Sequence, residues 1–532
     1  MRVRKLRDGL ENRVLRGRRC KGLWGFAALV VCAVMVVSAV QLTKAVTIDI
    51  APDTLNLASG GNWVSAYVEP TVLLSDNFDD GDCLGWTVLS GTWGMAADMG
   101  NWVYSGTATG DEQVTYALST GTYEDVVFEA KVKAVNNAGH YGIVVREDGS
   151  GNHYGFYLNA YNNGAASSEG LYYFGYWNGA YDTIVAWTSA GGAYTDANLW
   201  NTMKIVASGC TFELYINGIL VNTVTDPHSH ALSGHVGLII DQYESKGQNC
   251  YFDDIRVVEN FDVSTVDVST VKLWHIWADD FSDPIWTGAN WQKLSTALWT
   301  VEGGEYQGTG SVSTRDISLA GAMLSPIEES DVTMNVKVRN DAFGALDQGA
   351  IIPIRYKDGT HMAALVFFPT SVRLQMVTGG SWTCFPSLEG VPMDIGYTQH
   401  DVRIVAEGAD YEVYVDDMET PKITATFASA DLGKRLGVWA YGGGGSAFFD
   451  DFSVLRYITS AVQDPTSVGD YDCDGVPDLM VKFDRAALAT YLTAHGLTTG
   501  YVDLVVTGNA NDGSAFSGAD SLRVISKGKV KL

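Results

Sequence analysis

The chain has little positive charge, little proline and few cysteines. Its 532 residues carry 35 Lys and Arg against 62 Asp and Glu, a formal net charge of −27. A body this acidic repels nucleic acid and anionic lipid, which excludes a role in binding polyanions. Only 12 residues are proline, whereas 58 are glycine and 11% are aromatic. That balance is typical of an all-β protein with many tight turns.

The chain also lacks long hydrophobic runs, with one exception. Leu23–Val40 is apolar, carries no charge and follows a basic stretch, which is the pattern of an export signal. Tripeptides ending in alanine at 37–39 and 43–45 offer two cleavage sites. An uncleaved membrane anchor is the alternative, because about 18 apolar residues just span a bilayer. Either interpretation assigns residues 1–45 to a signal or anchor helix and places the remainder outside the cell or on its surface. Contact with the membrane is expected only through this N-terminal segment, if it is not cleaved.

The cysteines argue against a zinc site, because no CxxC spacing occurs. Beyond the N-terminal segment the chain has an odd number of them: Cys83, Cys210, Cys250, Cys384 and Cys473. One disulfide would fit this set, and Cys83 with Cys250 is the first pair to test. The alternative is that all of them are small buried residues.

An internal repeat is the most informative feature of the sequence. The runs KIVA (204–207), FELYING (212–218), GHVGL (234–238) and YFDDI (251–255) recur as RIVA (403–406), YEVYVDD (411–417), RLGV (435–438) and FFDDF (448–452). The copies also open alike, with SDNF at 75–78 and ADDF at 278–281. Apolar and polar residues alternate in these runs, which is typical of strands with one buried face. The repeat therefore predicts two copies of one β-sandwich domain.

The order of these motifs resembles the concanavalin-A/laminin-G-like jelly-roll sandwiches, a group that includes lectin-like modules, carbohydrate-binding modules and glycosidase domains. The resemblance assigns residues 73–258 and 277–455 to the two copies. The remaining segments, 46–72, 259–276 and 456–532, each have too few strands to close a core. Joined, they resemble a small extracellular Ig-like β-sandwich module of archaeal and bacterial surface proteins. The predicted fold is therefore two jelly-roll sandwiches inserted into one discontinuous Ig-like β-sandwich.

A DxDxDGxxD loop predicts a calcium site in the last segment. Its ligands would be the carboxylates of Asp470, Asp472, Asp474 and Asp478 and the backbone carbonyl of Val476. Oxygen ligands at this spacing surround a hard cation. The position of the final EF-hand glutamate holds Val481, so the loop resembles the strand-flanked calcium loops of integrin-type propellers. The alternative is a solvated acidic turn.

Two weaker calcium sites are predicted at the ends of the sandwiches, where the first and last strands of lectin-like domains are neighbours. Asp76 with Asp253 would form one, and Asp280 with Asp450 the other. The alternative is that these acidic residues only mark the ends of edge strands and bind no cation.

Aromatic residues crowd one region of the first copy and predict a ligand surface. They are Tyr172, Tyr173, Tyr176, Trp177, Tyr181 and Trp187. Aromatic faces stack on sugar rings, although alternate members of such a run would instead face the core. The second copy has only Trp382 and Phe385 in a comparable place, so the two copies are expected to differ in ligand.

Sequence evidence for catalysis is thin. Glu124, Asp125 and Glu129 lack the ExDxE spacing that a retaining glycosidase needs, and Val127 occupies the position of an alternating carboxylate. His228 and His230 flank Ser229, which favours a polar loop over a ligand pair. The sequence thus predicts an exported, non-enzymatic protein that binds calcium and recognises a glycan or a neighbouring surface protein. A jelly-roll glycoside hydrolase and a structural spacer of a surface layer are the alternatives.

Overall fold

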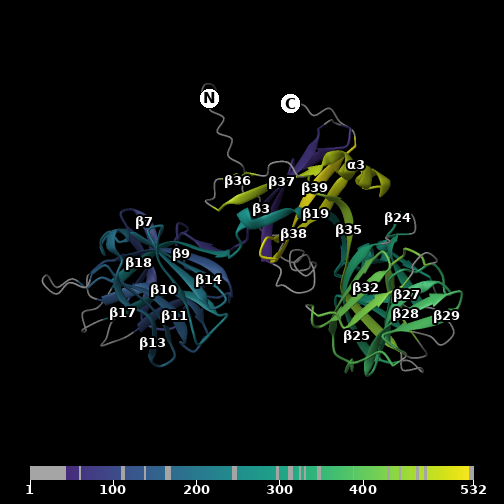
Figure 1. Cartoon of the computed structure of the whole chain (residues 1–532), viewed down its shortest axis with the longest axis horizontal. Helices are drawn as coiled ribbons and strands as arrows, with labels where there is room; N and C mark the ends of the chain where they lie inside the picture. The colour runs from purple at the N-terminus through teal and green to yellow at the C-terminus, as the bar shows by residue number, and fades with distance from the viewer. Residues whose placement is uncertain are drawn as a thin grey trace, which may run out of the picture.

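The computed structural model describes residues 44–526 apart from short gaps. The gaps are 59–60, 109–113, 137–138, 162–168, 243–248, 295–298, 310–315, 323–324, 329–330, 344–348, 388, 419, 428–431, 442–444, 463–466 and 473–475. The predicted signal or anchor, Leu23–Val40, lies outside the described residues. Within them, no helix combines the length and apolar character needed to cross a bilayer. Figure 1 shows two rounded β-bodies on either side of a smaller central one.

The first body, here the first sandwich, packs two antiparallel sheets face to face. One sheet has the order β13-β12-β11-β10-β17-β8-β5, and the other β16-β15-β14-β9-β18-β7-β6 with β4 beside β18. The bounds are β4 (Val72–Asp76), β5 (Trp86–Val88), β6 (Thr92–Asp98), β7 (Asn101–Thr107), β8 (Val114–Ser119), β9 (Val126–Ala134), β10 (Gly139–Glu147), β11 (His153–Asn159), β12 (Leu171–Trp177), β13 (Tyr181–Ser189), β14 (Asn201–Ser208), β15 (Thr211–Ile216), β16 (Ile219–Thr225), β17 (His235–Gln242) and β18 (Asn249–Glu259). The core between the sheets includes Phe128, Phe156 and Phe212, all fully buried.

The second body, here the second sandwich, repeats this plan. Its separate sheet has the order β20-β23-β34-β26-β27-β28-β29, with β24 beside β23 and β30 beside β28. Its other sheet runs β33-β32-β31-β25-β35, with β22 joining β21 to β35. The bounds are α2 (Pro284–Asn290), β20 (Trp291–Lys293), β21 (Trp299–Glu302), β22 (Glu305–Thr309), β23 (Asp316–Ala322), β24 (Ser325–Pro326), β25 (Val332–Ala342), β26 (Ala350–Pro353), β27 (Met362–Phe368), β28 (Ser371–Thr378), β29 (Ser381–Phe385), β30 (Val391–Pro392), β31 (His400–Glu407), β32 (Asp410–Val415), β33 (Ile423–Thr426), β34 (Gly437–Ala440) and β35 (Ser446–Ser460).

The central body, here the scaffold, is assembled from segments far apart in the sequence. Its strands continue the sheet of β35 in the order β19-β38-β39-β1-β3-β37-β36, with β2 beside β39. The bounds are β1 (Lys44–Ala51), β2 (Thr54–Asn56), β3 (Trp63–Pro70), β19 (Val266–Asp279), β36 (Ser467–Gly469), β37 (Asp478–Asp484), α3 (Arg485–Ala494), β38 (Gly500–Ala510) and β39 (Ala515–Ile525). The first strands of the described chain therefore pair with its last ones, through β1 with β39 and β3 with β37. The all-β fold class is confirmed.

The repeat motifs build the same corner in both sandwiches. Phe78 and Phe281 are fully buried and adopt left-handed φ angles of 55° and 53°. The preceding aspartates hold both turns: Asp76 accepts from the Phe78 amide, and Asp279 from the Phe281 amide, each at 2.9 Å. Each aspartate also accepts from an indole, Trp86 at 2.9 Å or Trp291 at 2.7 Å. The motifs thus encode a structural turn.

The candidate disulfide between Cys83 and Cys250 is not formed, because both residues are free thiols. Cys83 lies in the loop before β5 and contacts Tyr104. The alternative, that all these cysteines are small buried residues, holds for Cys250, whereas Cys83, Cys210 and Cys384 are partly exposed. Cys473 lies outside the described residues.

Candidate functional sites

Strand alternation divides the aromatic run of the first sandwich between two faces. Tyr172 and Tyr176 point into the core, where 2% and 7% of their surface is exposed. Tyr173 belongs to a separate cluster on the outer side of the sheet, with Tyr157 and Ile239. Tyr172 and Tyr176 are therefore removed from the predicted ligand surface, because neighbouring strand residues point to opposite faces. Trp177, half-buried at the end of β12, contacts Tyr181 at 4.7 Å.

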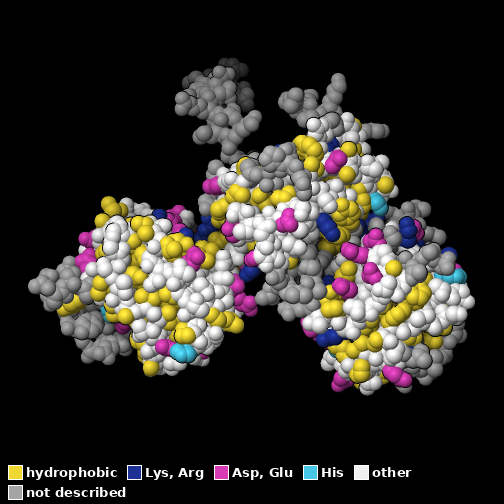
Figure 2. Space-filling model, viewed as in Figure 1, with side chains coloured by type: hydrophobic (Ala, Val, Ile, Leu, Met, Phe, Trp, Pro, Cys, Tyr) yellow, Lys and Arg dark blue, Asp and Glu magenta, His cyan; other side chains and the backbone are white. Residues whose placement is uncertain are grey.

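The aromatic residues left on the outer side are here called the tyrosine face: Tyr157, Tyr173, Tyr181, Trp187 and His140. Tyr157 and Tyr173 are themselves buried, with 2% and 7% of their surface exposed, and lie beneath Tyr181 and Trp187. Ring centroids lie 5.6 Å apart for Tyr173 and Tyr181, and 5.4 Å for Tyr173 and Trp187. Trp187 also packs on the His140 imidazole at 4.4 Å. Trp187 and Tyr181 remain 37% and 41% exposed, so a ligand can reach them. In Figure 2, yellow hydrophobic side chains gather on the visible sides of both sandwiches.

Glycines form the floor beneath two of these tyrosines. A Cβ at Gly155 would lie 2.3 Å from Tyr157, and one at Gly175 would lie 2.5 Å from the Tyr173 hydroxyl. The ring tips are also fixed: the Tyr157 hydroxyl lies 3.1 Å from His153 Nε2, and the Tyr173 hydroxyl 3.0 Å from Thr183 Oγ1. The rings consequently lie along the sheet in one orientation. Burial raises the pKa of Tyr181 to about 12.

The corresponding outer face of the second sandwich holds a pocket of about 350 Å³. Its lining includes Arg373, Gln375, Trp382, Trp439 and Tyr441. Trp382 is 54% exposed. The indole Nε1 of Trp439 is buried and has no hydrogen-bond partner among the described residues. This pocket therefore has an aromatic wall, which includes Trp382, one of the two aromatic residues noted in the sequence of the second copy.

Two polar side chains meet in the same pocket. With its amide oxygen turned toward Arg373, Gln375 accepts from the guanidinium Nε at 2.6 Å and Nη2 at 2.9 Å. The guanidinium also lies 4.2 Å from the Phe368 ring. A cation held in this way would favour a polar or anionic ligand group. Phe385, the other aromatic residue noted in the sequence of the second copy, packs against the core of the second sandwich and contacts the Phe427 ring.

The DxDxDGxxD loop faces two strands of the scaffold. Carboxylate oxygens of Asp472, Asp478 and Glu69 lie within 4.8 Å of one another. They line a pocket of about 250 Å³ together with Asp49, Tyr67 and Tyr471. Asp478 is buried, and its Oδ2 accepts from the Tyr471 amide at 2.7 Å. Asp470 is exposed, the Val476 side chain is buried, and Asp474 lies outside the described residues.

Glu69 was missed by sequence reasoning. It lies on β3, about 400 residues before the loop, and reaches it because β3 pairs with β37, the strand that begins at Asp478. The available signal was the alternation of β3, in which Tyr67 and Glu69 occupy outward positions. Converging carboxylates are ligands that Ca²⁺ prefers, so the donor set fits the predicted cation.

The four acids at the sandwich ends bind neighbouring donors, and among the described residues none joins a group of three potential ligands. Asp76 holds the Phe78 turn, and Asp280 accepts from the Ser282 amide at 3.0 Å. Asp253 and Asp450 accept from the amides that follow them, each at 2.8 Å. Burial raises the pKa of Asp253 to about 6 and also raises that of Asp450.

The acids considered for catalysis lie away from the tyrosine face. Glu129 and Val127 are on β9, in the opposite sheet, and line a pocket with Lys204 and Arg256. Asp125 accepts from Arg146 at 3.2 Å and from the Gly209 amide at 2.8 Å. Glu124 contributes its backbone carbonyl to the same arginine. These contacts are structural.

Comparison with known proteins gives one family match and several solved structures with weak likeness to one sandwich. Residues 75–258, roughly a third of the chain, match the family model described as the 3-keto-alpha-glucoside-1,2-lyase-like domain. Carbohydrate-binding module CBM66 from Bacillus subtilis is 21% identical, with 33% of this chain and 96% of that chain covered and a TM-score of 0.27. The catalytic domain of a laminarinase from Thermotoga petrophila is 14% identical, with 36% and 99% covered and a TM-score of 0.29. Likenesses this weak establish no function. No curated protein matches the chain.

Proposed function

We propose that the chain is an exported, non-enzymatic protein that recognises carbohydrate on the outer faces of its two sandwiches and binds calcium in its scaffold. The observation that carries the proposal is the tyrosine face, where Trp187 and Tyr181 are exposed beside rings in fixed positions. Such rings present flat apolar surfaces to the C–H side of a sugar. The family match to a glucoside-related domain spans the same sandwich.

The two sandwiches are proposed to bind different glycans. The tyrosine face consists of aromatic rings and one imidazole, that of His140, whereas the second pocket places Arg373 and Gln375 beside Trp382. A guanidinium pairs well with carboxylates. The second sandwich should therefore prefer a glycan with an acidic sugar, and the first a neutral one.

A glycan array probed with the full chain, with and without calcium, tests the proposal. Trp187→Ala should weaken binding to neutral glycans about fivefold, since one aromatic stacking contact contributes about 1 kcal/mol. Trp382→Ala should weaken only the acidic set. Trp102→Ala is the matched control, because this indole is 47% exposed on β7 of the opposite sheet. A wild-type protein that binds no glycan, or a Trp187→Ala protein with unchanged binding, would contradict the proposal.

The calcium proposal has its own measurement. A cation bound between Glu69, Asp472 and Asp478 would join β3 to the start of β37 and so stabilise the folded scaffold. Extracellular calcium modules bind at roughly 0.1–1 mM, so millimolar calcium would contribute about 1 kcal/mol. Chelation should lower the melting temperature, and Glu69→Gln with Asp472→Asn should remove that response. If this double variant still responds fully, the calcium lies elsewhere.

A second candidate function, glycoside cleavage, is favoured by one observation. His140 Nδ1 lies 3.2 Å from Asp241 Oδ2 on the tyrosine face, beside Trp187. An imidazole oriented by a carboxylate can act as a general base. The family match suggests a 1,2-elimination from a 3-keto glucoside. The imidazole would take the acidic C2 proton, the C2–H electron pair would form the C1=C2 bond as the bond from C1 to the leaving oxygen breaks, and that oxygen would take up the proton from the imidazolium. Formation of the enone from a 3-keto glucoside, and its loss in His140→Ala, would establish this reaction.

A further inference from the structure

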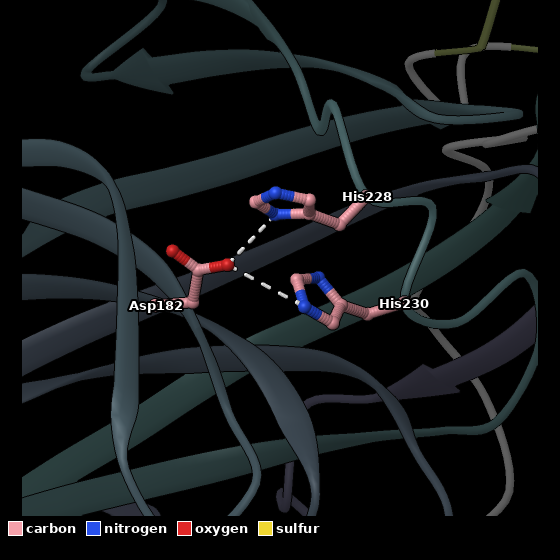
Figure 3. A group of neighbouring side chains, drawn as sticks. All are labelled: Asp182, His228 and His230. Atoms are coloured by element: carbon pink, nitrogen blue, oxygen red, sulfur yellow. Dashed lines mark hydrogen bonds and ion pairs between the residues drawn. The ribbon is translucent and has the colours of Figure 1, made fainter.

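Three potential metal ligands meet at the rim of the first sandwich, away from the calcium loop. Asp182 is the second residue of β13, the edge strand of one sheet. His228 and His230 lie in the loop after β16, the edge strand of the opposite sheet. Figure 3 shows both imidazoles directed at the same aspartate oxygen. Asp182 Oδ2 is 2.9 Å from His228 Nδ1 and 3.4 Å from His230 Nε2.

These separations suit a small transition metal. Zinc binds imidazole nitrogen and carboxylate oxygen at about 2.0–2.1 Å in tetrahedral geometry, which places neighbouring ligand atoms about 3.3 Å apart. All three ligand atoms here lie within 4.8 Å of one another. Calcium prefers six to eight oxygen ligands, so two imidazoles and one carboxylate select against it.

A buried carboxylate orients one of the two imidazoles. Asp226 Oδ2 lies 3.0 Å from His230 Nδ1, and the Asp226 side chain is fully buried. The same oxygen accepts from the Tyr154 hydroxyl at 2.6 Å and from the His230 amide at 2.9 Å. With Nδ1 donating to Asp226, the lone pair of Nε2 points toward Asp182. A carboxylate behind a ligating histidine is the usual outer-shell partner of a metal site.

The remaining contacts hold the rings without covering the site. The Tyr176 ring stacks on His230 with centroids 4.3 Å apart. Ser229 has a left-handed φ of 53°, so the backbone turns between the two histidines and brings both rings to one side. The His228 side chain is 62% exposed and that of Asp182 40% exposed, which leaves the solvent side open for water or a fourth ligand.

We propose that Asp182, His228 and His230 bind a divalent transition metal of the zinc class, with Asp226 as the positioning residue behind His230. The metal bridges the edge of one sheet to the loop leaving the edge of the other. Its fourth position faces solvent. The site is separate from the calcium proposal in residues, in ligand chemistry and in place.

Cobalt(II) is the probe, because tetrahedral cobalt with nitrogen and oxygen ligands has strong visible absorption. The full chain, stripped with chelator and kept in excess calcium to fill oxygen-rich sites, is titrated with cobalt and then with competing zinc. One equivalent of cobalt should give the tetrahedral spectrum, and zinc should abolish it. His228→Ala should weaken cobalt binding at least tenfold, and Asp226→Asn about 10- to 100-fold. His361→Ala is the matched control, since this histidine also lies beside an aspartate, 3.2 Å from Asp358.

His228 is exposed, so the chelated His228→Ala protein should melt like the chelated wild type even if changes at Asp226 or His230 disturb folding. Zinc should raise the melting temperature of the wild type but not of His228→Ala. No saturable cobalt spectrum, or equal cobalt affinity in the wild type and His228→Ala, would overturn the proposal. So would an equal loss of affinity in His361→Ala.

Discussion

The two sandwiches begin from the same motifs and end with different surfaces. Both bury a phenylalanine with a left-handed φ after an aspartate, and both bind that aspartate to an indole. Their outer faces share little: tyrosines over glycines in the first, and Arg373 with Gln375 in the second. The repeated motifs thus specify the corner of the fold, while the strands between the motifs vary and determine what each face can bind.

The sandwiches also differ in how they join the scaffold. β19 and β35 belong to the scaffold and to the second sandwich at once, so one sheet runs through both bodies. The first sandwich keeps both of its sheets to itself. Lys44 of the scaffold forms ion pairs with Glu259 at 3.1 Å and with Asp125 at 3.7 Å in this sandwich. Figure 1 shows the same contrast, with β35 extending from the central body into the second sandwich.

The largest expected effect separates these two attachments. Phe78→Ala and Phe281→Ala each remove a fully buried ring that stacks on a tyrosine, at 5.3 Å and 5.1 Å respectively. Each should cost about 3–5 kcal/mol. In calorimetry, Phe281→Ala should lower the unfolding temperature of the second sandwich and of the scaffold together, whereas Phe78→Ala should lower only that of the first sandwich. If Phe281→Ala lowered the unfolding temperature of the second sandwich but not that of the scaffold, the two bodies would not unfold together and this difference between the sandwiches would be contradicted.

The next effect concerns acid stability. Burial lowers the pKa of His153 to about 4. Between pH 4 and about pH 6.5, this histidine is therefore neutral in the folded first sandwich but protonated in the unfolded chain. Stability should therefore fall as the pH drops from 6.5 toward 4, by about 2 kcal/mol at pH 5. His153→Gln should flatten this dependence in melting curves recorded at several pH values.

The control for this prediction is the partly exposed His361, at the start of the corresponding strand of the second sandwich. His361→Gln should leave the pH dependence of the first sandwich unchanged. If the stability of the wild type and of His153→Gln fell equally steeply with decreasing pH, a group other than His153 would govern the pH dependence.

The smallest expected effect concerns an ion pair that occurs at equivalent positions in both sandwiches. Lys131 pairs with Asp254, and Lys337 pairs with Asp451 at 2.7 Å, at equivalent positions of the two sandwiches. Partly exposed ion pairs contribute roughly 0–1 kcal/mol. Lys131→Met and Lys337→Met should therefore each lower the free energy of unfolding by less than about 1 kcal/mol in denaturant titrations. The Lys337 pair is less exposed and should show the larger loss.

Sequence reasoning succeeded where the information was local. Alternation predicted the all-β class, and repeated motifs such as FELYING and YFDDI fell on β15 and β18. It missed site residues that come together only through the pairing or packing of strands far apart in the sequence. Glu69 joins Asp478 only through the pairing of β3 with β37. Likewise, Asp182 reaches His228 and His230 only because the edges of two sheets meet.

Face assignment was uncertain for a related reason. A run such as LYYFGYW contains aromatics at both odd and even positions, so its composition does not reveal which set faces the core. The structure puts Tyr172, Phe174 and Tyr176 inside. The glycines Gly155 and Gly175 were a usable signal, because small residues on a strand allow a neighbouring ring to lie flat against it.

The glycine floor under the tyrosine face bears on the entropy of binding. A side chain that is free in solution loses about 0.5–1.5 kcal/mol when a ligand immobilises it. Tyr157 and Tyr173 have already lost that freedom, since a glycine limits each ring from below and a hydrogen bond holds each hydroxyl. Their ordering is completed during folding and owes nothing to the ligand. Because Tyr157 and Tyr173 are 2% and 7% exposed, they form a fixed support for Tyr181 and Trp187, the exposed rings on which a sugar would stack.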